Sequence, residues 1–86
     1  MMKPTIHSNG TGAADLLEQV ENVYRLAGDL AEALGKACPN GRDYYPQGDN
    51  AVHTAIAEHS ARMVAVEKIR DDMLALADNV YDNRKG

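Results

Sequence analysis

The residues best suited to recognition chemistry lie in one turn-rich segment, residues 38–49. It combines two prolines and two glycines with a single arginine and two adjacent tyrosines. Tyrosine and arginine are enriched at binding hot spots because they offer a large rigid area and a planar donor group. Proline and glycine disfavour helix, so we expect a 12-residue loop here. The predicted partner-binding residues are Arg42, Asp43, Tyr44, Tyr45 and the nearby His53.

Three interpretations of this loop remain open. In the first, the Asn40-Gly41 pair makes a tight turn with positive φ and projects the following residues toward a macromolecule. In the second, the tyrosines fill the open end of a helix pair while Arg42 pairs with Asp43 or caps the first helix. In the third, the arginine, the tyrosines and His53 bind an anionic small molecule. Adjacent residues of an extended segment point apart, so we expect one tyrosine to pack inward and the other to face solvent.

The remaining polar residues do not form a recognisable catalytic or metal-binding set. His53 and His59 are about 120° apart on a helix, whereas a metal-binding pair needs a spacing of three or four residues. Cys38, the only cysteine, has no apparent activating partner. Four carboxylates of the C-terminal part are expected to face solvent: Glu67, Asp71, Asp72 and Asp78. We therefore predict a protein that is not an enzyme, with no metal and no cofactor.

A first helix is predicted over residues 12–37, after a flexible arm at residues 1–11. Its apolar residues recur at alternating spacings of four and three, which is a heptad seam. The seam residues are Leu16, Val20, Val23, Ala27, Leu30, Leu34 and Ala37. A second row lies beside that seam and widens the apolar face: Leu17, Tyr24, Ala31 and Cys38. Gly28 and Gly35 lie on the outer face, where they are either tolerated or mark the close approach of another backbone.

A second helix is predicted over residues 50–82, followed by a tail at residues 83–86. Its stripe changes spacing once, between Met63 and Ile69, as in a short stammer. The stripe consists of Val52, Ile56, His59, Met63, Val66, Ile69, Met73, Leu76 and Val80. His59 lies on this stripe, where an interface histidine is expected, and it would make assembly sensitive to pH. Further apolar residues on both helices indicate a second neighbour, and the predicted oligomer interface is Leu17, Tyr24, Ala57, His59, Ala61 and Val64.

Length and composition favour self-association. The 86 residues are 44% apolar but include no Trp and no Phe, so the core is built from aliphatic residues and much alanine. A core of that kind is thin, because each alanine buries little area. The predicted fold class is all-α: an antiparallel two-helix hairpin with a 12-residue loop, forming one domain and self-associating into a helical bundle, most simply a dimer.

Charge and hydropathy exclude several partner classes. The net charge of -4 is spread along both helices, whereas duplex-binding proteins usually carry a basic face, so nucleic acid is not the expected partner. No apolar run approaches the roughly 20 residues needed to cross a bilayer, so a membrane is not expected either. A single cysteine fits a reducing compartment. We therefore expect a cytoplasmic protein.

One resemblance bears on the setting. Residues 40–48, with the alanine-rich stretch 55–62, resemble the middle of short proteins encoded by phages and prophages, over about half the chain. The resemblance implies a non-enzymatic accessory protein that binds a host protein in the host cell cytoplasm, with inhibition of that protein as one consequence of binding. It carries no assigned activity. The alternative is a helical oligomer that binds a small molecule or nucleotide at the loop and subunit interface.

Overall fold

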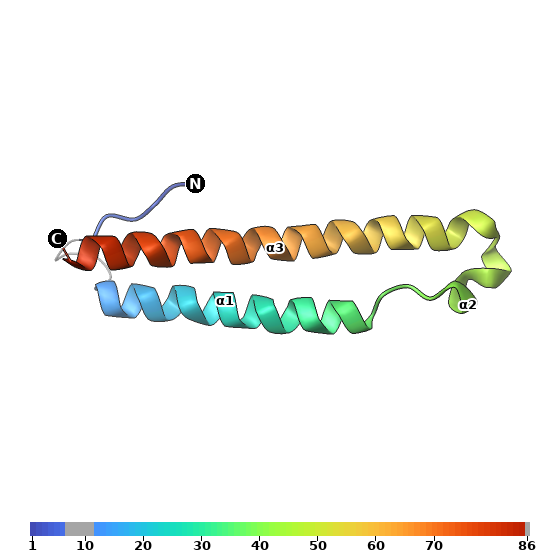
Figure 1. Cartoon of the computed structure of the whole chain (residues 1–86), viewed down its shortest axis with the longest axis horizontal. Coiled ribbons are helices and arrows are strands. Elements are labelled where there is room, and N and C mark those ends of the chain that lie inside the picture. Colours follow the sequence, from blue (N-terminus) through green and yellow to red (C-terminus); the bar gives the residue numbers. More distant parts are fainter. Residues whose placement is uncertain (7–11, 86) are drawn as a thin grey trace.

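The chain folds into helices that are arranged as a long rod. The structure is a computed structural model that describes residues 1–6 and 12–85. The elements are α1 (Ala13–Lys36), α2 (Gly41–Tyr44), the 3-10 turn η1 (Tyr45–Gln47) and α3 (Asp49–Lys85). Helices α1 and α3 lie side by side and run in opposite directions, and α2 lies at the end where the chain turns back (Figure 1). The described residues include no strand, so the predicted all-α class is confirmed.

The connection between the long helices differs from the prediction, because it contains α2 and η1 instead of a loop without helix. Both prolines lie where a missing N–H does no harm: Pro39 precedes the cap of α2, and Pro46 lies in the first turn of η1. The positive φ predicted for the turn at Asn40-Gly41 is also wrong. The Asn40 side chain instead accepts a hydrogen bond from the N–H of Arg42 at 2.9 Å and caps α2. Among the described residues, only Gly48 has a positive φ.

The rod is much longer than it is wide, with extents of 60 × 20 × 18 Å. Its radius of gyration is 18.6 Å, compared with about 12 Å expected for a compact domain of this length. Helix α3 is roughly 55 Å long and α1 roughly 36 Å, so α3 extends beyond its neighbour. The connecting segment lies along that extension and contacts α3 through α2 and η1 (Figure 1).

At every second position, the seam of α1 is shifted by one residue from the predicted seam. Its buried residues are Leu17, Val20 and Ala27, and its half-buried residues continue the same row with Tyr24, Ala31 and Leu34. This row keeps a heptad spacing and shares Val20, Ala27 and Leu34 with the prediction. Val23 and Leu30 are exposed instead. Two neighbouring apolar rows satisfy the same heptad pattern, so spacing alone did not determine which row faces α3.

The seam of α3 differs from the predicted stripe at three positions. Its buried residues are Ala55, His59, Val66, Ala77 and Val80. Ala55 and Ala77 take the positions expected for Ile56 and Leu76, and Arg70 takes that expected for Ile69. From His59 onward, the spacing then alternates between four and three without the predicted stammer. Alanines fit close to the partner helix, whereas the larger isoleucines lie beside the seam.

The most tightly packed part of the rod lies near the chain termini. Leu17, Val20, Ala77 and Val80 form a buried cluster, and Val80 is fully buried. The first six residues do not simply extend into solvent as an arm. Ile6 packs against this cluster, and the Asn79 side-chain amide donates a hydrogen bond to the Pro4 carbonyl at 3.4 Å. Residues 7–11 of the predicted arm lie outside the described residues, and residues 83–85 of the predicted tail are helical.

Candidate functional site

The tip of the rod, defined as residues 37–53, is held by short-range backbone hydrogen bonds. After the cap at Asn40, the N–H of Asp43 donates to the Asn40 carbonyl at 3.0 Å and closes the turn of α2. The N–H of Gly48 donates to the Tyr45 carbonyl at 3.4 Å at the end of η1. Gly48 then adopts φ 102° and ψ 167°, a conformation that is essentially restricted to glycine, and turns the chain into α3. The side chains of the tip are thus carried by a defined backbone.

The predicted partner-binding residues are distributed over the three elements of the tip. Arg42 and Asp43 are exposed on α2, and His53 is exposed on the first part of α3. Tyr44, the last residue of α2, is half-buried, whereas Tyr45 on η1 is 84% exposed. This difference confirms the expectation that one tyrosine packs inward and its neighbour faces solvent. The expected reason for the difference was wrong. The two tyrosines point apart because they lie at the junction of two short helices, and not because the segment is extended.

A hollow of about 350 Å³ lies within the tip, between the segment that connects the long helices and the first part of α3. Its lining residues are Gly41, Tyr44, Tyr45, Gly48, Val52 and His53. Three of the five predicted partner-binding residues therefore meet around one space. Arg42 and Asp43 do not line it, so the guanidinium that was expected to attract an anionic ligand lies outside. The hollow offers aromatic rings and one imidazole, which suit a small planar molecule or a side chain of another protein.

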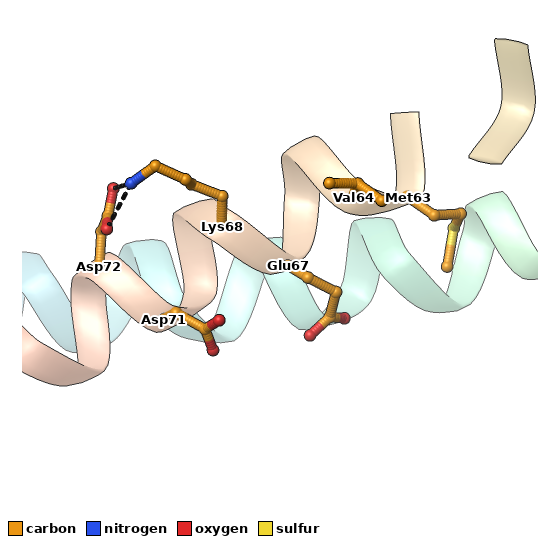
Figure 2. A pocket seen from close by; sticks show the side chains of 6 residues that line it. All are labelled: Met63, Val64, Glu67, Lys68, Asp71 and Asp72. Carbon is orange, nitrogen blue, oxygen red and sulfur yellow. Dashed lines mark hydrogen bonds and ion pairs between the residues drawn. The ribbon is translucent and has the colours of Figure 1, made fainter. Parts of the chain in front are cut away.

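A second hollow, of about 480 Å³ and shallower than the first, lies along α3 alone, and we call it the shallow surface. Its lining residues are Met63, Val64, Glu67, Lys68, Asp71 and Asp72. The Lys68 ammonium donates to both carboxylate oxygens of Asp72 at 2.9 Å (Figure 2). The carboxylates of Glu67 and Asp71 point to the other side of the helix (Figure 2). A surface formed by one helix cannot enclose a ligand, so this region offers little to a small molecule. It is the solvent-facing acidic patch expected from the sequence, partly neutralised by lysine.

Sequence reasoning missed an arginine in the seam. The Arg70 guanidinium carbon lies 5.1 Å from the centroid of the Tyr24 ring, a cation–π distance. Its Nη1 donates to a carboxylate oxygen of Glu67 at 3.2 Å, and its buried Nε has no hydrogen-bond partner. The hydrogen bond and charge of Glu67 raise the pKa of Arg70, so the side chain stays cationic at any physiological pH.

Gly28 provides the space for this arginine. A Cβ atom at Gly28 would lie 3.9 Å from both Nε and Nη2 of Arg70. We expected either a tolerated glycine or the close approach of another backbone, and instead a side chain lies against it. The signal in the sequence was a glycine in the middle of one helix and an arginine within the apolar row of the other. These two residues can be matched only when the antiparallel register of the helices is known.

The six predicted interface residues fall into two groups. Leu17 and His59 are buried in the seam of the chain itself, and Tyr24 is half-buried beneath Arg70, so these side chains leave little area for a second copy. The other three are exposed on the side of α3 that faces away from α1: Ala57, Ala61 and Val64. Each is two positions from a buried seam residue and therefore about 160° away from it around the helix.

Comparison with known proteins adds no relative: no protein-family model matches the chain, and neither curated proteins nor solved structures give a significant match. Within residues 1–6 and 12–85, no three His, Cys, Asp or Glu side chains come together as a metal site would require. In the same residues, neither long helix has a stretch apolar enough to span a bilayer.

Proposed function

We propose that this chain is a non-enzymatic interaction protein that self-associates into a helical bundle, most simply a dimer of two-helix hairpins, and binds a protein partner through its tip. The observation that carries the proposal is the amount of surface left uncovered. The accessible surface is 6367 Å², whereas a compact monomer of this mass exposes roughly 5,000 Å². The excess of roughly 1,400 Å² on one chain is larger than the area of about 800 Å² that each partner contributes to a standard protein interface.

The tip has the features of a binding surface. Tyr45 is 84% exposed, although an aromatic ring gains most when it is removed from water. It is also displayed on a fixed backbone, because it begins η1 and is followed by Pro46 and the constrained Gly48. A ring held in this way loses little conformational entropy on binding. Arg42 and Asp43 on α2 add opposite charges nearby, which can fix the orientation of a partner.

The resemblance of residues 40–48 and 55–62 to phage-encoded proteins suggests the setting. The proposed partner is a host protein in the host cell cytoplasm, and occupation of its surface by the tip would inhibit it. The two functions need different parts of the rod. Self-association would use the sides of the long helices, while the tips remain free at the ends.

The tip proposal can be tested with the double substitution of Arg42 and Tyr45 by alanine. Tagged wild-type and variant chains are incubated with host lysate, and captured proteins are quantified by mass spectrometry. We expect the variant to lose a protein that the wild type captures, while its helicity and its sedimentation remain unchanged. Gln47→Ala is the matched control, because Gln47 is also exposed on η1. Equal capture by the double variant would refute the tip assignment, and loss of assembly would mean that these residues support the fold.

The hollow of about 350 Å³ keeps a second candidate function open, that of a helical oligomer with a small molecule or nucleotide at the tip. Its volume is within the range of ligand pockets. Because Arg42 lies outside the hollow, a neutral planar ligand fits better than an anionic one. Native mass spectrometry of the purified chain tests this candidate: a retained mass that disappears in Tyr44→Ala and His53→Ala would support it, and its absence from the wild type would count against it.

A further inference from the structure

We propose that a second copy of the chain docks on one particular side of the rod, which we call the apolar flank: Val23, Leu26, Leu30 and Ile69. This inference rests on the proposed self-association and names the surface that carries it. It differs from the sequence-based prediction, which divided the interface between residues of the seam and three exposed residues on the outer side of α3. Each residue of the flank is between 41% and 50% exposed.

The geometry of α1 places its three flank residues on one side of the seam. The contacts of Glu21 with Tyr81 and of Gly28 with Arg70 mark the opposite side. Val23 is two positions from Glu21, and Leu26 and Leu30 are each two positions from Gly28. Residues two positions apart are separated by about 160° around the helix axis, measured along the shorter arc. The flank residues of α1 therefore lie across the seam from those contacts.

Helix α3 completes the flank from the same side. Tyr81 marks the opposite side through its hydrogen bond to Glu21 at 3.2 Å. Ile69 is about 120° from Tyr81 around the helix, and Leu76 is about 140° from it. Ile69 and Leu76 are seven positions apart and so lie on one line. The register set by the contact of Arg70 with Gly28 brings the adjacent Ile69 level with Leu26 and Leu30. Side chains of two helices thus form one continuous apolar surface.

The chain itself already covers one end of this side. Asn79, which donates to the Pro4 carbonyl, is about 160° from Tyr81 and so lies on the same side of α3 as Leu76. Ile6, two residues after Pro4, packs against the buried cluster at this end of the rod. The chain's first residues thus cover the part near the termini, while Val23, Leu26, Leu30 and Ile69 remain uncovered.

The other two sides fit a second copy less well. The side marked by Glu21 and Tyr81 includes the exposed Arg25, four positions from Glu21, whose ion pair with Asp29 extends over the outer side of α1. Charged residues are depleted from the centres of homodimer interfaces. The outer side of α3 offers Ala57, Ala61 and Val64, of which only Val64 has a sizeable side chain, and it lies beside the charged residues of the shallow surface.

The area available agrees with a dimer. Each partner in a standard interface contributes about 800 Å². The rod exposes roughly 1,400 Å² more than a compact monomer of its mass, so an interface of standard size would remove more than half of the excess. Two helix pairs joined in this way form a four-helix bundle, in which each helix has two neighbours. The tips remain accessible at its ends.

The test compares the full-length chain with two double variants by sedimentation velocity over a dilution series. Leu26→Gln with Leu30→Gln changes the flank without changing the net charge, and half-exposed positions tolerate glutamine in a helix. Ala57→Gln with Val64→Gln is the matched control on the outer side of α3. We expect the wild type and the control to dimerise, and the flank variant to be monomeric with unchanged helicity or to dissociate at least about tenfold more readily.

A measurement on the unmodified chain covers the case in which the flank variant fails to fold. Methyl resonances of Val23, Leu26, Leu30 and Ile69 should shift when the wild type is diluted, while those of Ala57 and Val64 should not. If the wild type dimerises but the flank variant does too, or if only the outer methyl groups shift, the flank assignment is overturned and self-association stands. If the wild type is monomeric at all concentrations, the self-association proposal fails as well.

Discussion

Replacing Gly28 by alanine should stabilise the chain. Glycine in a helix interior is about 1 kcal/mol less favourable than alanine, and Gly28 lies in the middle of α1. The added Cβ would meet only the Nε and Nη2 atoms of Arg70, each at 3.9 Å, which is an ordinary van der Waals distance. The helix preference is therefore gained without a steric penalty. We expect the free energy of unfolding to rise by about 1 kcal/mol and the melting temperature by about 4–8 °C.

The measurement is thermal and urea unfolding followed by circular dichroism. Protein concentration must be the same for all variants, because the proposed self-association would make the melting temperature depend on it. Gly35→Ala is the matched control, since no atom lies within 4 Å of a Cβ built there. Gly35 lies in the last turn of α1, so its gain should be smaller.

A larger side chain at the same position tests the arginine contact directly. Leucine has nearly the helix preference of alanine, but at position 28 its branch needs the space of the guanidinium. Displacing Arg70 from Tyr24 would lose a cation–π contact of about 0.5–2 kcal/mol. Gly28→Leu should therefore be about 1 kcal/mol less stable than Gly28→Ala, while Gly35→Leu and Gly35→Ala should differ little. Equal stability of the two variants at position 28, or a destabilising alanine there, would refute the placement of Arg70 over Gly28.

Two further substitutions test the core and the tip. Val80→Ala removes two methyl groups from a fully buried site and should lower the free energy of unfolding, measured in urea, by about 2 kcal/mol. The control Val64→Ala, at a site that is 70% exposed, should change it by less than about 0.5 kcal/mol. Similar effects of the two substitutions would contradict the assignment of Val80 to the seam. Gly48→Ala forces a side chain onto φ 102° and should cost about 1–3 kcal/mol. Gly41→Ala, in open space without a positive φ, should cost much less in the same thermal assay, and equal losses would show that the turn at Gly48 is not strained.

The long helices could be predicted from the sequence because their signals are local. Heptad spacing and the absence of interior proline determined both helices to within a few residues of α1 and α3. The short helices of the tip were missed because proline and glycine were taken as helix breakers regardless of position. Pro39 lies directly before the cap of α2, and Pro46 lies in the first turn of η1; proline is well tolerated at both places. Whether a proline breaks or begins a helix depends on its neighbours, here the Asn40 cap.

The candidate site could be predicted only in part, because it combines local and tertiary features. That one of Tyr44 and Tyr45 packs inward while the other faces solvent was expected from their adjacency, but their adjacency did not indicate which of them is exposed. The hollow that places Tyr44 beside His53 depends on the turn at Gly48 and could not be deduced from spacing. The contact of Arg70 with Gly28 depends on the register between two helices. Register is determined by the whole seam, including alanines whose contribution no local pattern reveals.

The error in the seam prediction and the proposed docking surface have the same physical origin. A helix with two adjacent apolar rows can turn only one of them toward a single partner helix, so the other remains beside the seam. Val23, Leu30 and Ile69 were assigned to the seam by their spacing, and all three are exposed in the structure. A chain that contained only the residues needed for one helix contact would have polar side chains at these positions. Their apolar character is accounted for if a further helix pair covers them, and in the proposed dimer a second copy of the chain supplies that pair.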